Sequence, residues 1–121
     1  MLVIRAPQMQ AFTDLMKNRF DVRMQTHLLI RFPARFSGPE DPKLPRLVRL
    51  GTAKAKSHGI TGDTDIKRYL EFMTMLTPDF DVNPKSAWAG VILRDSRTTG
   101  HAKILALDSA HLNQKRKAAR A

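Results

Sequence analysis

The chain has 121 residues and no cysteine, which excludes disulfides, thiolate metal sites and cysteine nucleophiles. Its length predicts one domain, and its 42% of apolar residues suffice for a small core. Lys and Arg number 21 against 11 Asp and Glu, so the formal net charge is +10, which favours polyanions or acidic protein surfaces as partners.

The chain start predicts a cytoplasmic protein without a membrane partner. The apolar run before Arg5 is too short for a signal peptide. No window approaches the roughly 20 consecutive apolar residues that span a bilayer. The absence of cysteine fits a reducing compartment.

The N-terminal third predicts a short extended segment followed by a long helix. Val3 and Ile4 are β-branched, which favours extended backbone over residues 1–5. Pro7 suits the first turn of a helix, and Pro33 ends that helix near Arg31. Between them, apolar side chains recur every three or four positions: Met9, Phe12, Met16, Phe20, Met24 and Leu28.

The middle of the chain predicts two further helices separated by turns. The proline-rich segment 37–45 reads as a loop, and the helix after it runs to about Ser57. Small residues in that helix, including Gly51, predict a close approach to another helix. Gly59 then supplies the left-handed stop.

A third helix is predicted between Thr61 and Pro78. Thr61 is expected to cap it, with Asp63 and Asp65 near the positive end of the helix dipole. Its apolar positions follow the spacing of a buried face: Ile66, Tyr69, Leu70, Met73 and Leu76.

The last third predicts two helices and a frayed end. Asn83 is the expected N-cap of a short helix that begins at Pro84. A final helix carries Ile104, Leu105 and Leu112 and is expected to fray afterwards. The fold class is therefore all-α, a single small bundle of about five helices, with one domain over residues 1–112 and a basic tail over 113–121.

The stretch TPDFDVNPK, residues 77–85, raises the question of a calcium loop. Asp79, Asp81 and Asn83 alternate as the first ligands of such a loop do. The glycine of position 6 and the glutamate of position 12 are replaced by Pro84 and Gly90, so the pattern does not support calcium binding.

We interpret this stretch instead as a structural joint between two helices. Pro78 stops one helix, Phe80 and Val82 are expected to point inward, and the aspartates accept backbone or arginine hydrogen bonds, with Arg68 as the candidate partner. The residues assigned to the joint are Asp79, Phe80, Asp81, Asn83, Pro84 and Trp88.

The chain shows little catalytic equipment. No two histidines lie four residues apart as a helical metal pair requires, and no G-x-S-x-G elbow occurs. Pairs such as Asp63 with Asp65 are more typical of helix caps than of acid/base catalysis. The sequence thus predicts a protein that is not an enzyme, with no catalytic, metal-binding or cofactor-binding residues and no cofactor.

Two kinds of partner fit the exposed charge and the apolar segments. Cations on one polar face of the second helix and in the tail suit nucleic acid, or equally an acidic protein; the tail cations are Lys115, Arg116, Lys117 and Arg120. Methionine and phenylalanine on helical faces suit a protein partner. The candidate protein contacts are Leu2, Val3, Ile4, Arg5, Met9, Phe12, Met16 and Phe20.

A resemblance covers roughly residues 1–107. It rests on an apolar-basic start, a long first helix and a fixed pattern whose members are Gly59, Ile60, Thr61, Asp65, Arg68, Tyr69, Leu70, Met73, Asp79, Phe80, Asp81, Pro84, Trp88, Ala89, Ile92 and Leu93. The chain resembles small accessory proteins encoded in Gram-negative genomes beside type VI secretion genes, PAAR-tip proteins and secreted toxins. It departs from them in its basic tail and at Thr77.

The resemblance implies a non-enzymatic adaptor or chaperone that binds a secreted effector or a secretion-tip component. The alternatives are a small basic nucleic-acid-binding protein and an immunity protein to a neighbouring toxin. Neither the residues nor the resemblance indicates an oligomeric state.

Overall fold

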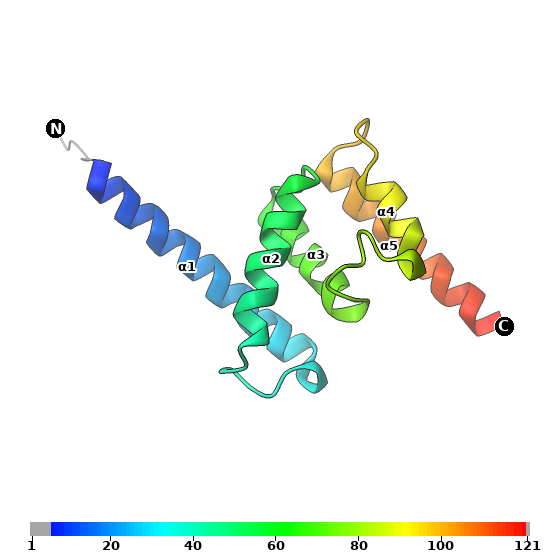
Figure 1. Ribbon diagram of the computed structural model, residues 1–121, viewed down its shortest axis with the longest axis horizontal. Helices are drawn as coiled ribbons and strands as arrows, with labels where there is room; N and C mark the ends of the chain where they lie inside the picture. Colours follow the sequence, from blue (N-terminus) through cyan, green and yellow to red (C-terminus); the bar gives the residue numbers. More distant parts are fainter. Residues whose placement is uncertain (1–5, 121) are drawn as a thin grey trace. The chain divides into compact units, whose positions relative to one another are not determined.

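The computed structural model describes residues 6–120, with side chains described for 10–11 and 13–119. Figure 1 shows helices joined by turns, and the described residues contain no strand. The predicted all-α class is confirmed. The chain divides into two compact units, Met1–Val48 and Arg49–Ala121. The predicted extended segment 1–5 lies outside the described residues.

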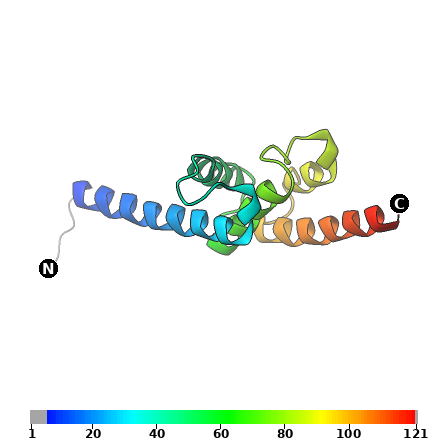
Figure 2. The same ribbon diagram turned by 90° about the horizontal axis from the view of Figure 1, so that it is seen from below.

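The first unit is built on the long predicted helix. Helix α1 spans Ala6–Arg31 and continues without a break in both views (Figures 1 and 2). Pro33 ends it as expected, and a 3-10 turn, η1, covers Pro33–Arg35. Among the described side chains of this unit, the buried apolar ones are Met24, Leu28, Leu44 and Val48.

A buried aspartate organises the loop between α1 and α2. Asp41 accepts hydrogen bonds of 2.9 Å from the backbone N–H groups of Ser37 and Lys43, and these bonds lower the pKa of its carboxyl group. Helix α2 spans Lys43–Ser57, so it begins inside the segment predicted as loop. Pro45 fits there because a first-turn residue needs no N–H partner.

The end of α2 and its approach to α3 follow the sequence signals. Gly59 has φ of +80°, and the N–H of Ile60 bonds back to the carbonyl of Ala55 at 2.9 Å, a Schellman-type stop. A Cβ on Gly51 would meet Leu70 and would lie 2.7 Å from Met73 Sδ. The predicted close approach of two helices is thus confirmed.

Helix α3 spans Asp63–Met75. It begins one residue later than a cap at Thr61 would require. Gly62, rather than Thr61, is the N-cap residue; its backbone is extended, and as a glycine it makes no side-chain cap bond. The prediction for Thr61 was therefore wrong. Glycine is tolerated at an N-cap, and the carbonyl of Gly62 accepts the N–H of Ile66 at 2.8 Å.

Two helices and a 3-10 turn complete the second unit. Asn83 caps η2, Pro84–Ser86, by accepting the N–H of Lys85 at 2.9 Å. The predicted cap is confirmed, but it opens a 3-10 turn, and the short α-helix begins later than predicted, at Ala87. Helix α4 spans Ala87–Leu93 and α5 spans Gly100–Arg120. Helices α3 and α4 both pack on α5, and the Thr99 hydroxyl accepts the N–H of Ala102 at the start of α5.

The last helix is longer than predicted. Residues 113–120 belong to α5, so the expectation that they fray was wrong. Ala, Lys and Arg are good helix formers, and cations are favourable at the negative end of the helix dipole. The predicted boundary between a domain over 1–112 and a tail over 113–121 falls inside α5 and stays a prediction.

Candidate functional site

Asp81 is the centre of a buried ionic contact. It is 7% exposed, and its two carboxylate oxygens have different partners. Lys54 Nζ donates to Oδ1 at 3.0 Å, and His58 Nε2 lies 3.3 Å from Oδ2. Burial raises the pKa of the Asp81 carboxyl, but the hydrogen bonds from Lys54 and His58 outweigh burial, and the net shift is downward. Asp81 is thereby held as an anion.

The partner predicted for the aspartates was wrong. Arg68 Nε donates to Asp108 at 2.7 Å, and Arg68 Nη1 donates to Glu71 at 3.2 Å. The three residues lie on α3 and α5, so this ion pair joins those two helices. Asp81 recruits Lys54 and His58, from the end of α2, in place of Arg68.

Asp79, the other aspartate of the joint, has local partners. Its Oδ1 accepts from the Thr77 hydroxyl at 2.7 Å and from Asn83 Nδ2 at 3.3 Å. These bonds lower the pKa of the carboxyl. Phe80 is fully buried, but Val82 is 68% exposed, so the expectation that Val82 points inward was wrong. Val82 is held outward because the turn 77–83 bonds to itself through Asp79.

The carboxylates of the joint are engaged in separate contacts. Within residues 6–120, no group of three or more His, Asp or Glu side chains could hold a metal ion. Asp79 serves its own turn, and Asp81 ties that turn to the end of α2. Both carboxylates therefore act as hydrogen-bond acceptors that hold the turn in place.

A run of aromatic rings fills the second unit beside this contact. Tyr69 lies 5.0 Å from Phe80 between ring centroids, and Phe72 lies 6.1 Å from Phe80 and 5.6 Å from His111. His111 in turn stacks on Trp88 at 6.1 Å with 14° between the ring planes. This run links Phe80 and Trp88 of the joint through α3 and α5.

His111 sits in an electropositive setting. With Arg68, Asp108, Leu112 and Lys115 it lines an open hollow of about 470 Å³. Burial lowers the pKa of His111 first, and the positive charges of Lys115 and Arg68 lower it further. The imidazole is therefore biased toward its neutral form.

The predicted protein contacts, which are residues 2–5 and four residues of α1, fall into three groups. Leu2, Val3, Ile4 and Arg5 lie outside the described residues, as do the side chains of Met9 and Phe12. Met16 is 47% exposed, whereas Phe20 is half-buried beneath the guanidinium of Arg23, 6.0 Å from its ring centroid. Of the described members, Met16 is available to a partner and Phe20 is partly covered.

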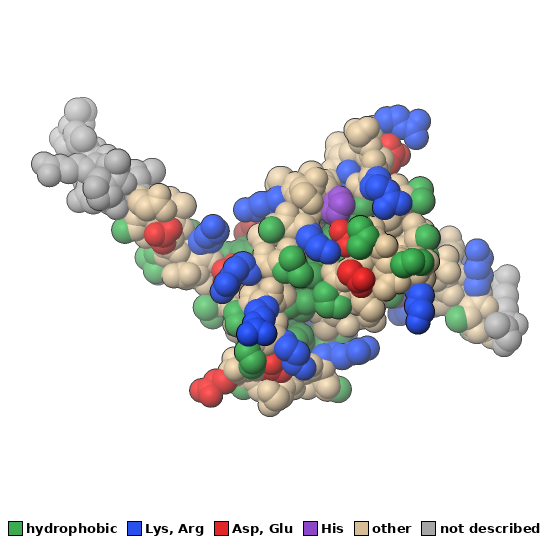
Figure 3. Space-filling view, in the orientation of Figure 1, with side chains coloured by type: hydrophobic (Ala, Val, Ile, Leu, Met, Phe, Trp, Pro, Cys, Tyr) green, Lys and Arg blue, Asp and Glu red, His purple; other side chains and the backbone are tan. Residues whose placement is uncertain are grey.

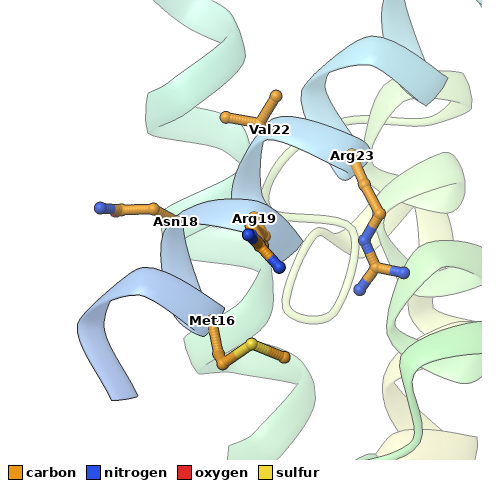
Figure 4. A pocket seen from close by; sticks show the side chains of 5 residues that line it. All are labelled: Met16, Asn18, Arg19, Val22 and Arg23. Atoms are coloured by element: carbon orange, nitrogen blue, oxygen red, sulfur yellow. The ribbon is translucent and has the colours of Figure 1, made fainter. Parts of the chain in front are cut away.

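The structure adds apolar residues to this surface. Leu15 is 48% exposed and Val22 is 59% exposed. Met16, Asn18, Arg19, Val22 and Arg23 line a shallow hollow along α1 (Figure 4). Val22 was not singled out from the sequence, although it stands seven residues after Leu15, a spacing that places both on one side of a helix. We call Leu15, Met16, Arg19, Val22 and Arg23 the α1 face.

The basic C-terminal residues lie on a helix rather than on a loose tail. Lys115, Arg116 and Lys117 are all exposed on α5. Figure 3 shows Lys and Arg side chains spread over the visible surface of the molecule, with Asp and Glu between them on its central part. The side chain of Arg120, the fourth predicted cation, is not among the described side chains.

Among residues 6–120, each helix is either too short or too polar to span a bilayer. The chain matches no protein-family model, no curated protein and no solved structure.

Proposed function

We propose that this protein is a non-enzymatic adaptor or chaperone-like accessory protein that presents the α1 face to a protein partner. The observation that carries the proposal is the exposure of three large apolar side chains within eight residues of one helix: Leu15 at 48%, Met16 at 47% and Val22 at 59%. Contiguous exposed apolar side chains on a charged surface are typical of interaction sites.

The spacing of the α1 face indicates how a partner would receive it. Leu15, Arg19 and Val22 follow an i, i+4, i+7 pattern, which is the anchor pattern of a helix that lies in a groove. Arg19 and Arg23 line the same hollow as Met16 and Val22. The complementary surface is a groove with an apolar floor and an acidic rim, and the net charge of +10 favours approach to it.

The partner class comes from the resemblance to small accessory proteins of type VI secretion clusters. Such an accessory protein serves a secreted effector or a secretion-tip component. A helix with exposed apolar side chains suits this task because an effector must be held and later released, and a single-helix contact buries less surface than an obligate interface.

The experiment is co-expression with the products of the adjacent genes, followed by size-exclusion chromatography with light scattering. We expect a defined complex with one product. The triple variant Leu15→Gln, Met16→Gln, Val22→Gln should lose the complex. The matched control Leu50→Gln, Val91→Gln, Leu105→Gln removes apolar side chains of similar exposure, 47%, 66% and 55%, from other helices and should retain it.

Two outcomes would overturn the proposal. One is a complex that survives the α1 triple variant and is lost in the control. The other is rescue of growth when a neighbouring toxin is co-expressed, because an adaptor does not neutralise its cargo and an immunity protein does.

A further inference from the structure

We infer that the C-terminal half of α5 is a nucleic-acid-binding element, distinct from the α1 face. In residues 109–120 the chain places four basic residues and no acidic one. These residues continue α5 as helix. Lys115, Arg116 and Lys117 are exposed, and none of the ion pairs found among the described residues involves them.

The exposed side chains of this element favour nucleic acid over a protein partner. From Asn113 to Ala119 they are cationic, amide or alanine side chains, with no large apolar group. A protein interface draws most of its energy from several aromatic and aliphatic anchors, and beyond Leu112, which is 50% exposed, residues 113–119 offer none. Binding to it must come from charge, and a phosphate backbone is the ligand that charge alone binds well.

Helical geometry distributes the three cations around the element. Consecutive residues are turned by about 100° on an α-helix, so Lys115, Arg116 and Lys117 project in three directions. In Figure 3 the outer end of α5 carries blue side chains and no red ones. A helix fits the major groove of duplex DNA, where phosphates flank it on both sides. Such a helix contacts both phosphate rows without reading bases.

This element follows the single acidic residue of α5. Asp108, the last acidic residue of the chain, is held by Arg68, so its charge is neutralised where the basic element begins. Lys115 lies in the hollow next to that ion pair. Lys115 therefore stands at the start of the element, and Arg116 and Lys117 follow it along α5.

The test measures binding of a short fluorescently labelled DNA duplex as a function of salt. The element variant is Lys115→Gln, Arg116→Gln, Lys117→Gln. The matched control is Arg46→Gln, Arg49→Gln, Lys56→Gln, three exposed cations of α2. Each variant removes three charges and lowers the net charge from +10 to +7, so total charge is equal and only its position differs.

We expect the element variant to lower the slope of log affinity against log salt by about 2.7, since each phosphate contact contributes about 0.9. When the salt is raised from about 50 to 200 mM, the factor by which affinity falls is then about 40 times smaller for the element variant than for the parent. The slope of the control should differ from that of the parent by less than about 0.9, the contribution of one phosphate contact. Circular dichroism checks that α5 stays helical in the element variant.

Three results would overturn the inference. The first is no binding of the duplex at low salt. The second is an equal fall in slope for both variants, which would assign binding to diffuse charge. The third is tighter binding of poly-L-glutamate than of the duplex, lost in the element variant, which would assign the element to an acidic protein. None of these depends on the α1 face, so the two proposals fail separately.

Discussion

Lys54 Nζ donates a 3.0 Å hydrogen bond to the Asp81 carboxylate, across 27 positions of sequence. The same carboxylate meets His58, and the His58 carbonyl accepts from the buried Lys103 Nζ at 2.9 Å. The end of α2, the turn before α4 and the first part of α5 are therefore joined through one short chain of polar contacts.

The first prediction concerns the charge of Asp81. Asp81→Asn should lower the free energy of unfolding by about 1.5–3 kcal/mol, the usual worth of a hydrogen bond to a charged group. The cause is that Lys54 loses a charged acceptor in a nearly buried site. Denaturant unfolding measures the change. Asp79→Asn is the control, and since the Asp79 carboxylate is bonded within an exposed turn, a loss as large as that of Asp81→Asn would contradict this account.

The second prediction concerns pH. The pKa of His111 is below its ordinary value of 6.5, so the unfolded chain binds a proton at a pH where the folded chain does not. The stability contributed by neutral His111 is present above about pH 6.5 and is lost as the pH falls through the lowered folded pKa. Thermal unfolding across this window should show the decline, and His111→Gln should flatten it.

The control for the pH series is His101→Gln, which removes an exposed histidine from the same helix. His111 is faced by Arg68 from α3 and by Asp108 and Lys115 from α5, and all three remain in the control. A decline that disappears in His101→Gln and persists in His111→Gln would assign the pH dependence to the wrong histidine.

The third prediction concerns the close contact between α2 and α3. Gly51→Ala places a methyl group against Leu70 and Met73. Overpacking of this kind costs about 1–3 kcal/mol, which reverses the gain that Ala usually brings to a helix. Ala53→Leu on the exposed side of α2 should change stability by less than about 0.5 kcal/mol. A stabilised Gly51→Ala protein would show that the two helices can separate at little cost.

The fourth prediction concerns the Tyr69 hydroxyl. Tyr69 is fully buried, and its hydroxyl has no hydrogen-bond partner among the described residues. Burial, followed by the charge of Asp81, raises its pKa. Tyr69→Phe removes a buried polar atom without changing the ring, so stability should rise by about 1 kcal/mol.

The comparison for Tyr69 is Thr74→Val. Thr74 is also buried, but its hydroxyl donates to the Leu70 carbonyl at 3.0 Å. Its removal should lower stability by about 1 kcal/mol. Equal losses in the two variants would mean that the Tyr69 hydroxyl makes a contact as valuable as that of Thr74.

Local signals in the sequence located most helix ends. Pro33 and Gly59 act through their own backbone geometry, and Asn83 acts on an N–H two residues away. These effects need no knowledge of the fold. The threonine side chain at position 61 favours a cap there, but the helix begins one residue later, so Gly62 occupies the N-cap position.

The pairing of residues far apart in the sequence could not be predicted from such local signals. Arg68 is separated by 40 positions from Asp108, and nothing in one sequence distinguishes that aspartate from Asp81 as its partner. The choice depends on how α3 lies against α5. The exposed position of Val82 has the same origin, because the alternation of side chains along a turn does not determine which of them face the core.

The candidate surfaces were only partly predictable. The apolar stripe of α1 predicts Met16 as a contact residue. The stripe alone does not show which of its members are buried and which are exposed. Met24 and Leu28 of the same stripe are buried while Met16 is exposed. The cations of α5 were read directly from the sequence, and their helical arrangement depends on residues 113–120 continuing the helix.

The stacked pair of Trp88 and His111 gives this protein an internal optical probe. Trp88 is its one tryptophan, and a protonated imidazole quenches indole emission where a neutral one does not. Fluorescence intensity therefore reports the protonation of His111 and the register of α4 against α5 without any attached dye.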